Sequence, residues 1–143
     1  MMISAKSRYA LRVMVDLAQH NSGEFIPVKE IATRQGISLK YLESIMVTMS
    51  KAGIIKGLRG KGGGYKLALA PMDITVGRIL KVTEKSLAPV SCLEMQPNLC
   101  KRSPACKTVR VWQEMYRVVD EYIESVTIAD LVDEIDSSDF YVI

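Results

Sequence analysis

The stretch from Ser38 to Ala70, SLKYLESIMVTMSKAGIIKGLRGKGGGYKLALA, decides the fold. Its first part carries apolar residues at helical spacing, so we expect a helix that is capped by Ser38 and ends at Gly53. The residues predicted to face the core are Leu42, Ile45, Met46 and Met49.

The second part of this stretch predicts a β-hairpin. One extended run begins at Ile54, and apolar residues alternate in a second run between Tyr65 and Leu69. Between the runs, residues 59–64 (RGKGGG) are basic and rich in glycine, as in a flexible turn.

Two further helices are expected before Ser38. The first follows Ser4 as N-cap and ends near His20, and the second has Pro27 near its start and Gly36 just past its end. A short turn then separates the second helix from the helix after Ser38, which predicts a helix-turn-helix. The hairpin that follows it is a wing.

A different organisation is expected after the hairpin. A helix in residues 71–84 has Asp73 or Thr75 as its cap, with Val76, Ile79 and Leu80 on the buried face. Residues 85–103 lack sustained periodicity. A long helix then has Ser103 as its cap, Pro104 at its first position and Cys106 near its start. Its apolar stripe comprises Val109, Trp112, Tyr116, Val119, Ile123 and Val126.

This stripe is long for so small a domain to cover, which favours a dimerisation helix over an ordinary core helix. A short last helix is capped by Thr127 and Asp130, and residues 137–143 are expected to be mobile. The predicted fold is mainly α with a small β-wing: a winged helix-turn-helix domain (1–84), a cysteine-rich sensor loop (85–106) and a dimerisation helix with the C-terminal segment (103–143).

Composition and charge limit the classes of function. The 143 residues are 48% hydrophobic and 24% charged, enough for a core. Residues 1–70 hold 11 Lys/Arg and 4 Asp/Glu (net +7), whereas residues 71–143 hold 8 and 12 (net −4). The basic half suggests a polyanion partner, although a solvated surface with chance asymmetry would look similar. The sequence has no signal-peptide pattern and no apolar run long enough to span a membrane. We therefore expect a cytoplasmic protein that does not bind a membrane.

A helix-turn-helix places the start of its second helix in the major groove. Ser38, Lys40 and Tyr41 can donate hydrogen bonds to phosphates or bases there. Glu43 either accepts a hydrogen bond from a cytosine amino group or lies on the solvent side beside a lysine. These two alternatives have equal support in the sequence.

The wing tip supplies the other predicted DNA contacts, Arg59 and Lys61. Arg59 suits a narrow minor groove, and the glycines allow close approach to the backbone. A plain turn is the alternative, and the spacing matches neither known glycine-rich phosphate loop.

The three cysteines, Cys92, Cys100 and Cys106, fall within fifteen positions with the spacing C-x7-C-x5-C. This pattern lacks the paired knuckles of structural zinc, and the only histidine, His20, is distant in sequence. An iron–sulfur cluster is one interpretation, with Lys101, Arg102 and Lys107 nearby to favour thiolates, and idle cysteines are the other. A disulfide switch between Cys100 and Cys106 also stays open. Because no histidine lies close in sequence, an enzyme with a nucleophilic cysteine is disfavoured.

The motif KYLESIMVTMSKAGIIKGLRGKGGGYKLA, together with the segments MMISAKSRYALRVMVDLA and PMDITVGRILKVTE, resembles the IscR-type (Rrf family) bacterial transcription regulators. The resemblance is strongest over residues 1–85. It implies a homodimeric winged-helix protein that binds double-stranded DNA at a palindromic operator. It places Ser38, Tyr41, Glu43 and Arg59 at DNA. The cysteines fall where cluster-binding members keep their ligands.

The fourth ligands known in this family are missing. Val109 stands where the regulator of cluster biosynthesis has a histidine, and Arg8 stands where nitric-oxide sensors have a carboxylate. The resemblance therefore implies a 4Fe–4S cluster, with an external or partner-chain ligand, rather than a 2Fe–2S cluster. Such a protein would be a cluster-gated repressor or activator. The alternative is a cluster-free regulator of sulfur metabolism, controlled by a protein partner or by thiol oxidation.

Overall fold

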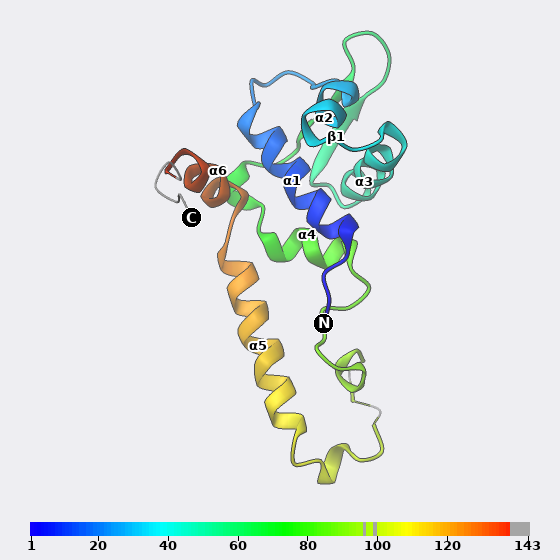
Figure 1. Ribbon diagram of the computed structural model, residues 1–143, viewed down its shortest axis with the longest axis vertical. Helices are drawn as coiled ribbons and strands as arrows, with labels where there is room; N and C mark the ends of the chain where they lie inside the picture. The colour runs from blue at the N-terminus through cyan, green and yellow to red at the C-terminus, as the bar shows by residue number, and fades with distance from the viewer. Residues whose placement is uncertain (96, 99, 138–143) are drawn as a thin grey trace.

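The computed structural model describes residues 1–95, 97–98 and 100–137 (Figure 1). It is mainly helical with a two-stranded antiparallel wing, which confirms the predicted fold class. The elements are α1 (Ala5–Gln19), α2 (Val28–Gln35), α3 (Leu39–Lys51), β1 (Ile55–Leu58), β2 (Gly64–Leu67), the 3₁₀ helix η1 (Pro71–Asp73), α4 (Val76–Thr83), the 3₁₀ helices η2 (Ser91–Leu93) and η3 (Ser103–Ala105), α5 (Val109–Ser125) and α6 (Ile128–Ser137).

Hydroxyl caps set where the helices begin, as their sequence predicts. The Ser4 hydroxyl accepts a hydrogen bond from the Ser7 amide, and Ser38 accepts one from the Tyr41 amide. Of the two candidates for α4, Thr75 is the cap, because its hydroxyl accepts from the Arg78 amide at 3.0 Å, whereas Asp73 belongs to η1. Each cap satisfies an amide that has no partner within its helix.

The core of the winged helix forms around α1, which packs against α2, α4, α6 and β2. The predicted inward face of α3 is confirmed, because its four core residues are fully buried, as are Val13 and Met14 of α1. A smaller cluster, Leu80, Leu87 and Ile123, joins α4 to α5.

The wing is tied to the helices by a third extended segment. Ile55 pairs with Leu67 and Leu58 with Gly64, while Ile26 exchanges two backbone hydrogen bonds of 2.9 Å with Tyr65. Gly64 has φ 149°, and a Cβ there would lie 2.0 Å from the Ile26 carbonyl oxygen. A larger residue would therefore separate the wing from the segment that leads into α2.

The expected start of the long helix is wrong. Ser103 and Pro104 begin the separate turn η3, Cys106 is extended (φ −77°, ψ 112°), and α5 begins at Val109. Val126 lies just past the end of α5. The Thr127–Asp130 capping pair is confirmed by its two reciprocal side-chain-to-backbone hydrogen bonds. Residues 138–143, which were expected to be mobile, lie outside the part of the chain that the structure describes.

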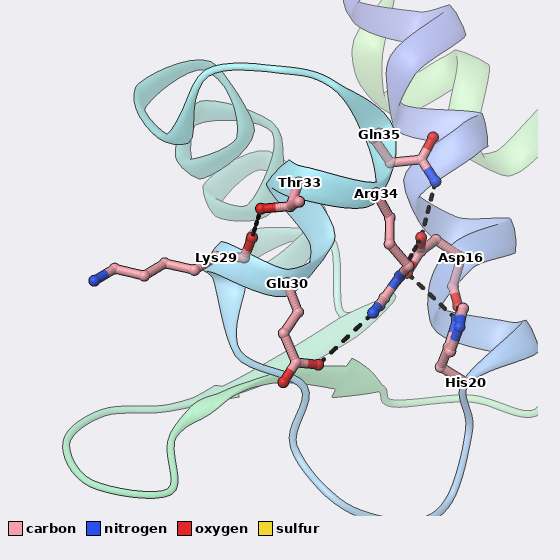
Figure 2. A network of polar contacts seen from close by, with 7 residues as sticks. All are labelled: Asp16, His20, Lys29, Glu30, Thr33, Arg34 and Gln35. Atoms are coloured by element: carbon pink, nitrogen blue, oxygen red, sulfur yellow. Dashed lines mark hydrogen bonds and ion pairs between the residues drawn. The ribbon is translucent and has the colours of Figure 1, made fainter.

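A buried carboxylate fastens the end of α1 to the end of α2 (Figure 2). Asp16 is 2% exposed. It accepts hydrogen bonds from the Arg34 guanidinium at 2.7 and 3.0 Å and from the Gln35 amide at 2.8 Å. Burial alone would raise the pKa of Asp16, but the hydrogen bonds from Arg34 and Gln35 and the arginine charge outweigh it and lower the pKa below 3.8.

The other end of α1 is fastened to α4 in a similar way. The buried Ser7 hydroxyl lies 2.5 Å from the Thr83 hydroxyl and donates to Glu84 at 2.7 Å. The same carboxylate accepts from the Ser4 amide at 2.6 Å. These hydrogen bonds lower the pKa of Glu84, and the bond from Ser7 has the largest effect.

Replacing Arg34 by alanine should lower the free energy of unfolding by about 2 kcal/mol at pH 7, because the buried Asp16 carboxylate would lose its charged partner. Since the pKa of Asp16 is lowered in the folded state, this contribution is fully present above its ordinary value of 3.8 and is lost as the pH falls through the folded-state pKa. Urea denaturation at pH 7 and pH 3 measures both effects. Arg8→Ala, which removes an exposed arginine of α1, is the control. Equal stability of the two variants at pH 7 would contradict the prediction.

Candidate nucleic-acid interface and cysteine segment

The start of α3 presents the predicted DNA contacts in different ways. Ser38 and Lys40 are exposed, and the Ser38 hydroxyl, although it caps α3, can still donate. Tyr41 is half-buried because its ring meets Tyr9 edge-on, with ring centroids 5.7 Å apart. Arg12 lies 5.1 Å from the Tyr9 ring centroid. Tyr41 therefore also helps to hold α3 against α1.

A cleft of about 640 Å³ separates α3 from the wing. Glu43 and Arg59 both line it, so the structure brings together residues that are 16 positions apart. No ion pair joins Glu43 to a lysine anywhere in the described ranges. Glu43 thus faces the same space as the wing.

The cleft contains residues that the sequence analysis missed. Lys29 and Lys51 line it and supply positive charge. Its lining also includes the unusually exposed Leu39, Val47 and Leu58, at 40–49% exposure. The four-residue spacing of Leu39, Glu43 and Val47 on one face of α3 was a signal that could have found part of this set.

Both predicted basic residues of the wing tip, Arg59 and Lys61, are exposed. Of the two, only Arg59 also lines the cleft. The wing therefore offers Arg59 beside α3 and Lys61 farther along the turn.

The cysteines lie in the segment that connects α4 to α5. Cys92 is half-buried in η2, Cys100 is exposed before η3, and Cys106 is half-buried after η3. All three are free thiols. Their chemistry suits iron–sulfur ligation, but within the described residues no three His, Cys, Asp or Glu side chains are grouped to hold a metal ion. A single chain in this conformation therefore supplies the donors without gathering them.

Cys106 is the thiol with a defined environment. Its sulfur lies 3.4 Å from the Thr108 hydroxyl. Hydrogen bonds from the Thr108 side chain and from the backbone at Thr108 and Val109, with a smaller effect of the Arg102 charge, lower the pKa of Cys106. The start of α5 thus favours a thiolate, the form that binds metals and reacts with oxidants.

Helix α5 has two apolar faces rather than one. The C-terminal part of the predicted stripe packs within the chain: Ile123 is 7% exposed, and Val119 packs on the cluster that joins α4 to α5. The exposed apolar residues form a second, unpredicted stripe with a spacing of three or four residues: Val111, Met115, Val118 and Tyr122, at 44–68% exposure. The predicted stripe thus contains the residues of α5 that α4 covers, whereas the stripe of exposed apolar residues was not predicted.

In the part of the chain that the structure describes, no helix combines the length and the apolar character needed to cross a membrane.

The chain resembles known proteins in both sequence and fold. Residues 3–134 match the family model Rrf2, described as an iron-dependent transcriptional regulator. The chain is 39% identical to protein rrf2 of Nitratidesulfovibrio vulgaris over 92% of its length and 87% of that protein. The structure of T. potens IscR superposes with a TM-score of 0.77 at 34% identity, covering 99% of this chain and 93% of the other.

The structure of CymR, the global cysteine regulator of B. subtilis, superposes equally well. Its TM-score is 0.77 at 32% identity, covering 94% of this chain and 98% of the other. The winged helix, its wing and the long helix therefore recur in regulators with different names. The chain belongs to the Rrf2 family of winged-helix transcriptional regulators, and it is a DNA-binding protein rather than an enzyme.

Proposed function

We propose that this protein is a homodimeric transcription regulator whose affinity for DNA is gated by an iron–sulfur cluster held by Cys92, Cys100 and Cys106. One observation carries the proposal: all three thiols lie in the single segment that joins the winged helix to α5. Anything that orders or releases this segment acts on the connection between the DNA-binding domain and the proposed dimer helix.

Two winged helices related by a two-fold axis would read a palindromic operator, with α3 of each in the major groove. Ser38, Lys40, Tyr41 and Glu43 would meet bases and phosphates there. Arg59 would reach the adjacent minor groove, and Lys61 the phosphates beside it. The shared cleft of Glu43 and Arg59 supports simultaneous contact by α3 and the wing.

The second apolar stripe of α5 supports dimerisation. Val111, Met115, Val118 and Tyr122 are exposed in one chain, and they line one side of a helix that projects from the winged helix (Figure 1). A two-fold pairing of this stripe would bury it against its own copy.

The family description as iron-dependent supports the cluster, as does the likeness to IscR. Three thiolates would hold a 4Fe–4S cluster, with the fourth ligand external or from the partner chain, because neither Arg8 nor Val109 offers a donor. The bound group would supply sensitivity to iron and oxidants. The protein's own part is to keep the Cys106 thiolate accessible at the start of α5.

The likeness to CymR favours a second candidate, a cluster-free regulator controlled by a protein partner or by thiol oxidation. Another similar structure is that of Staphylococcus aureus CymR in an oxidised form, at 28% identity. The separated thiols of the present chain agree with this alternative.

Replacing Arg59 by alanine should weaken binding to an operator at least about tenfold and reduce the salt dependence by about one released counterion, because one cationic contact is removed. The probe is a duplex selected by the wild-type protein from a random library, followed by fluorescence anisotropy at several salt concentrations. Arg117→Ala, an equal loss of charge at an exposed arginine whose ion-pair partners, Glu114 and Glu121, lie on its own helix, should leave both quantities unchanged. If Arg59→Ala keeps the wild-type affinity and salt slope, the wing does not contact DNA.

Val118→Glu should convert the dimer into a monomer, because a two-fold helix contact would bury two carboxylates without partners. Sedimentation velocity measures the change. Met72→Glu places the same charge on η1, where Met72 is 70% exposed, and should stay dimeric. A Val118→Glu protein that remains dimeric would exclude this stripe as the interface.

Protein purified and reconstituted without oxygen should carry about four iron and four sulfide per chain and absorb visible light as a 4Fe–4S protein. Cys92→Ala should lose most of both, whereas Ser91→Ala should retain them. A colourless wild-type protein that takes up no iron, but whose DNA affinity changes with a Cys100–Cys106 disulfide, would replace the cluster by the oxidation alternative.

A further inference from the structure

A glycine occupies an unexpected place at the start of α4. Gly77 is buried at the second position of the helix, and its backbone is not in the left-handed region that calls for glycine. Alanine is the better helix former at such a position, because glycine loses more backbone entropy. The local conformation therefore gives no reason for glycine here.

The reason lies 47 residues farther along the chain. A Cβ on Gly77 would lie 2.0 Å from the Glu124 Oε1 atom and 2.6 Å from its Cδ. The Glu124 carboxylate occupies the space that a methyl group on residue 77 would need. Glu124 belongs to the last turn of α5, so this contact joins the dimer helix to the winged helix.

The Glu124 carboxylate is held on both sides by α4 and its cap. The Thr75 hydroxyl donates to Oε2 at 3.1 Å, and the Lys81 ammonium donates to Oε1 at 3.0 Å. Lys81 also pairs with Asp120 at 2.7 Å, one turn earlier on α5. We call this set of five residues, Thr75, Gly77, Lys81, Asp120 and Glu124, the α4–α5 clamp.

The charged members of the clamp are half-exposed, with Lys81, Asp120 and Glu124 between 39% and 46%. Ion pairs with this exposure add little to stability. Several directed bonds to one carboxylate do restrict the angle at which two helices meet. The clamp is therefore better suited to orientation than to stability.

The backbone beside the clamp makes the same connection. The Val76 amide donates to the Val126 carbonyl at 2.8 Å, and the Ile128 amide donates to the Ile74 carbonyl at 2.9 Å. The C-terminal end of α5 is thus attached to α4, whereas its N-terminal end projects away from the winged helix (Figure 1). Because α5 has 17 residues and is about 25 Å long, a small rotation at the clamp displaces its far end considerably.

We propose that the α4–α5 clamp determines which spacing of operator half-sites the dimer accepts. The clamp orients α5 relative to the winged helix, and α5 pairs the two winged helices, so the clamp sets the separation of the two α3 helices. These must lie about one turn of DNA, roughly 34 Å, apart or at a multiple of that distance. This role rests on the dimer put forward under Proposed function.

The test compares the DNA affinity of Gly77→Ala with that of the wild-type protein. The probes are the selected operator duplex and derivatives in which the spacing between the half-sites is longer or shorter by one or two base pairs. The methyl group would displace the Glu124 side chain and break its bonds to Thr75 and Lys81, while the helix gains a better helix former. The ratio of affinities between the best spacing and its one-base-pair neighbours should fall about fivefold. The thermal midpoint should not fall, which separates this effect from a loss of folding.

Two further variants check the coupling. Glu124→Ala should reduce the same ratio, and Gly77→Ala combined with Glu124→Ala should be no worse than either alone, because both remove one contact. Glu121→Ala is the matched control: it removes a glutamate of α5 whose partner, Arg117, lies on the same helix, and it should keep the wild-type ratio.

The outcomes separate the two proposals. If the wild-type dimer prefers one spacing and Gly77→Ala keeps that preference, the clamp does not set the spacing, although the dimer stands. If the wild-type protein is a monomer in sedimentation and shows no preference for spacing, the proposed dimer fails and the clamp loses its role with it.

Discussion

The first helix is held at both ends by buried polar contacts, and the rest of the structure depends on them. Ser7 and Asp16 are the buried polar side chains of α1. Ser7 connects α1 to the end of α4 through Thr83 and Glu84, and Asp16 connects it to α2 through Arg34. A buried polar group without a partner is costly, so these bonds allow few orientations of α1. The apolar core then fills the space between α1 and its neighbours.

The contact at Glu84 also connects the DNA-binding part to the cysteine segment. Glu84 caps the end of α4, and the chain then leaves the winged helix toward η2 and Cys92. On its return, α5 meets the start of α4 at Glu124. Helix α4 therefore contacts both the departing and the returning chain. Helix α4 is therefore one route by which a change in the cysteine segment would act on the winged helix, beside the packing of α6 on α1.

The proposed roles of the cysteine segment and of α5 follow from the same connectivity. Cys106 lies two residues before Thr108, whose hydroxyl favours the thiolate, and α5 begins directly after it. Oxidation or ligation of Cys106 would thus occur at the outer end of α5. The attached end, at the clamp, is where such a change would become a change in the angle of the DNA-binding domains.

What the sequence determined by itself was local. The caps at Ser4, Ser38 and Thr127, the core face of α3 and the hairpin at residues 54–69 follow from hydrogen bonds and periodicities within a few residues, and the structure has them. The residues of α3 predicted to meet DNA were inferred from their place in the helix-turn-helix, which the same short-range pattern sets, and their contact with DNA stays a prediction.

Only the tertiary structure decided the rest. Ser103 and Pro104 carry a start signal for α5, yet the chain makes a separate turn there and α5 begins at Val109. Periodicity showed that α5 is apolar, but which stripe is open depends on what α4 covers. Glu43 and Arg59 share a cleft, and Gly77 and Glu124 share a space, although each pair is far apart in the chain. These features depend on how distant segments pack, and no short stretch of sequence contains that information.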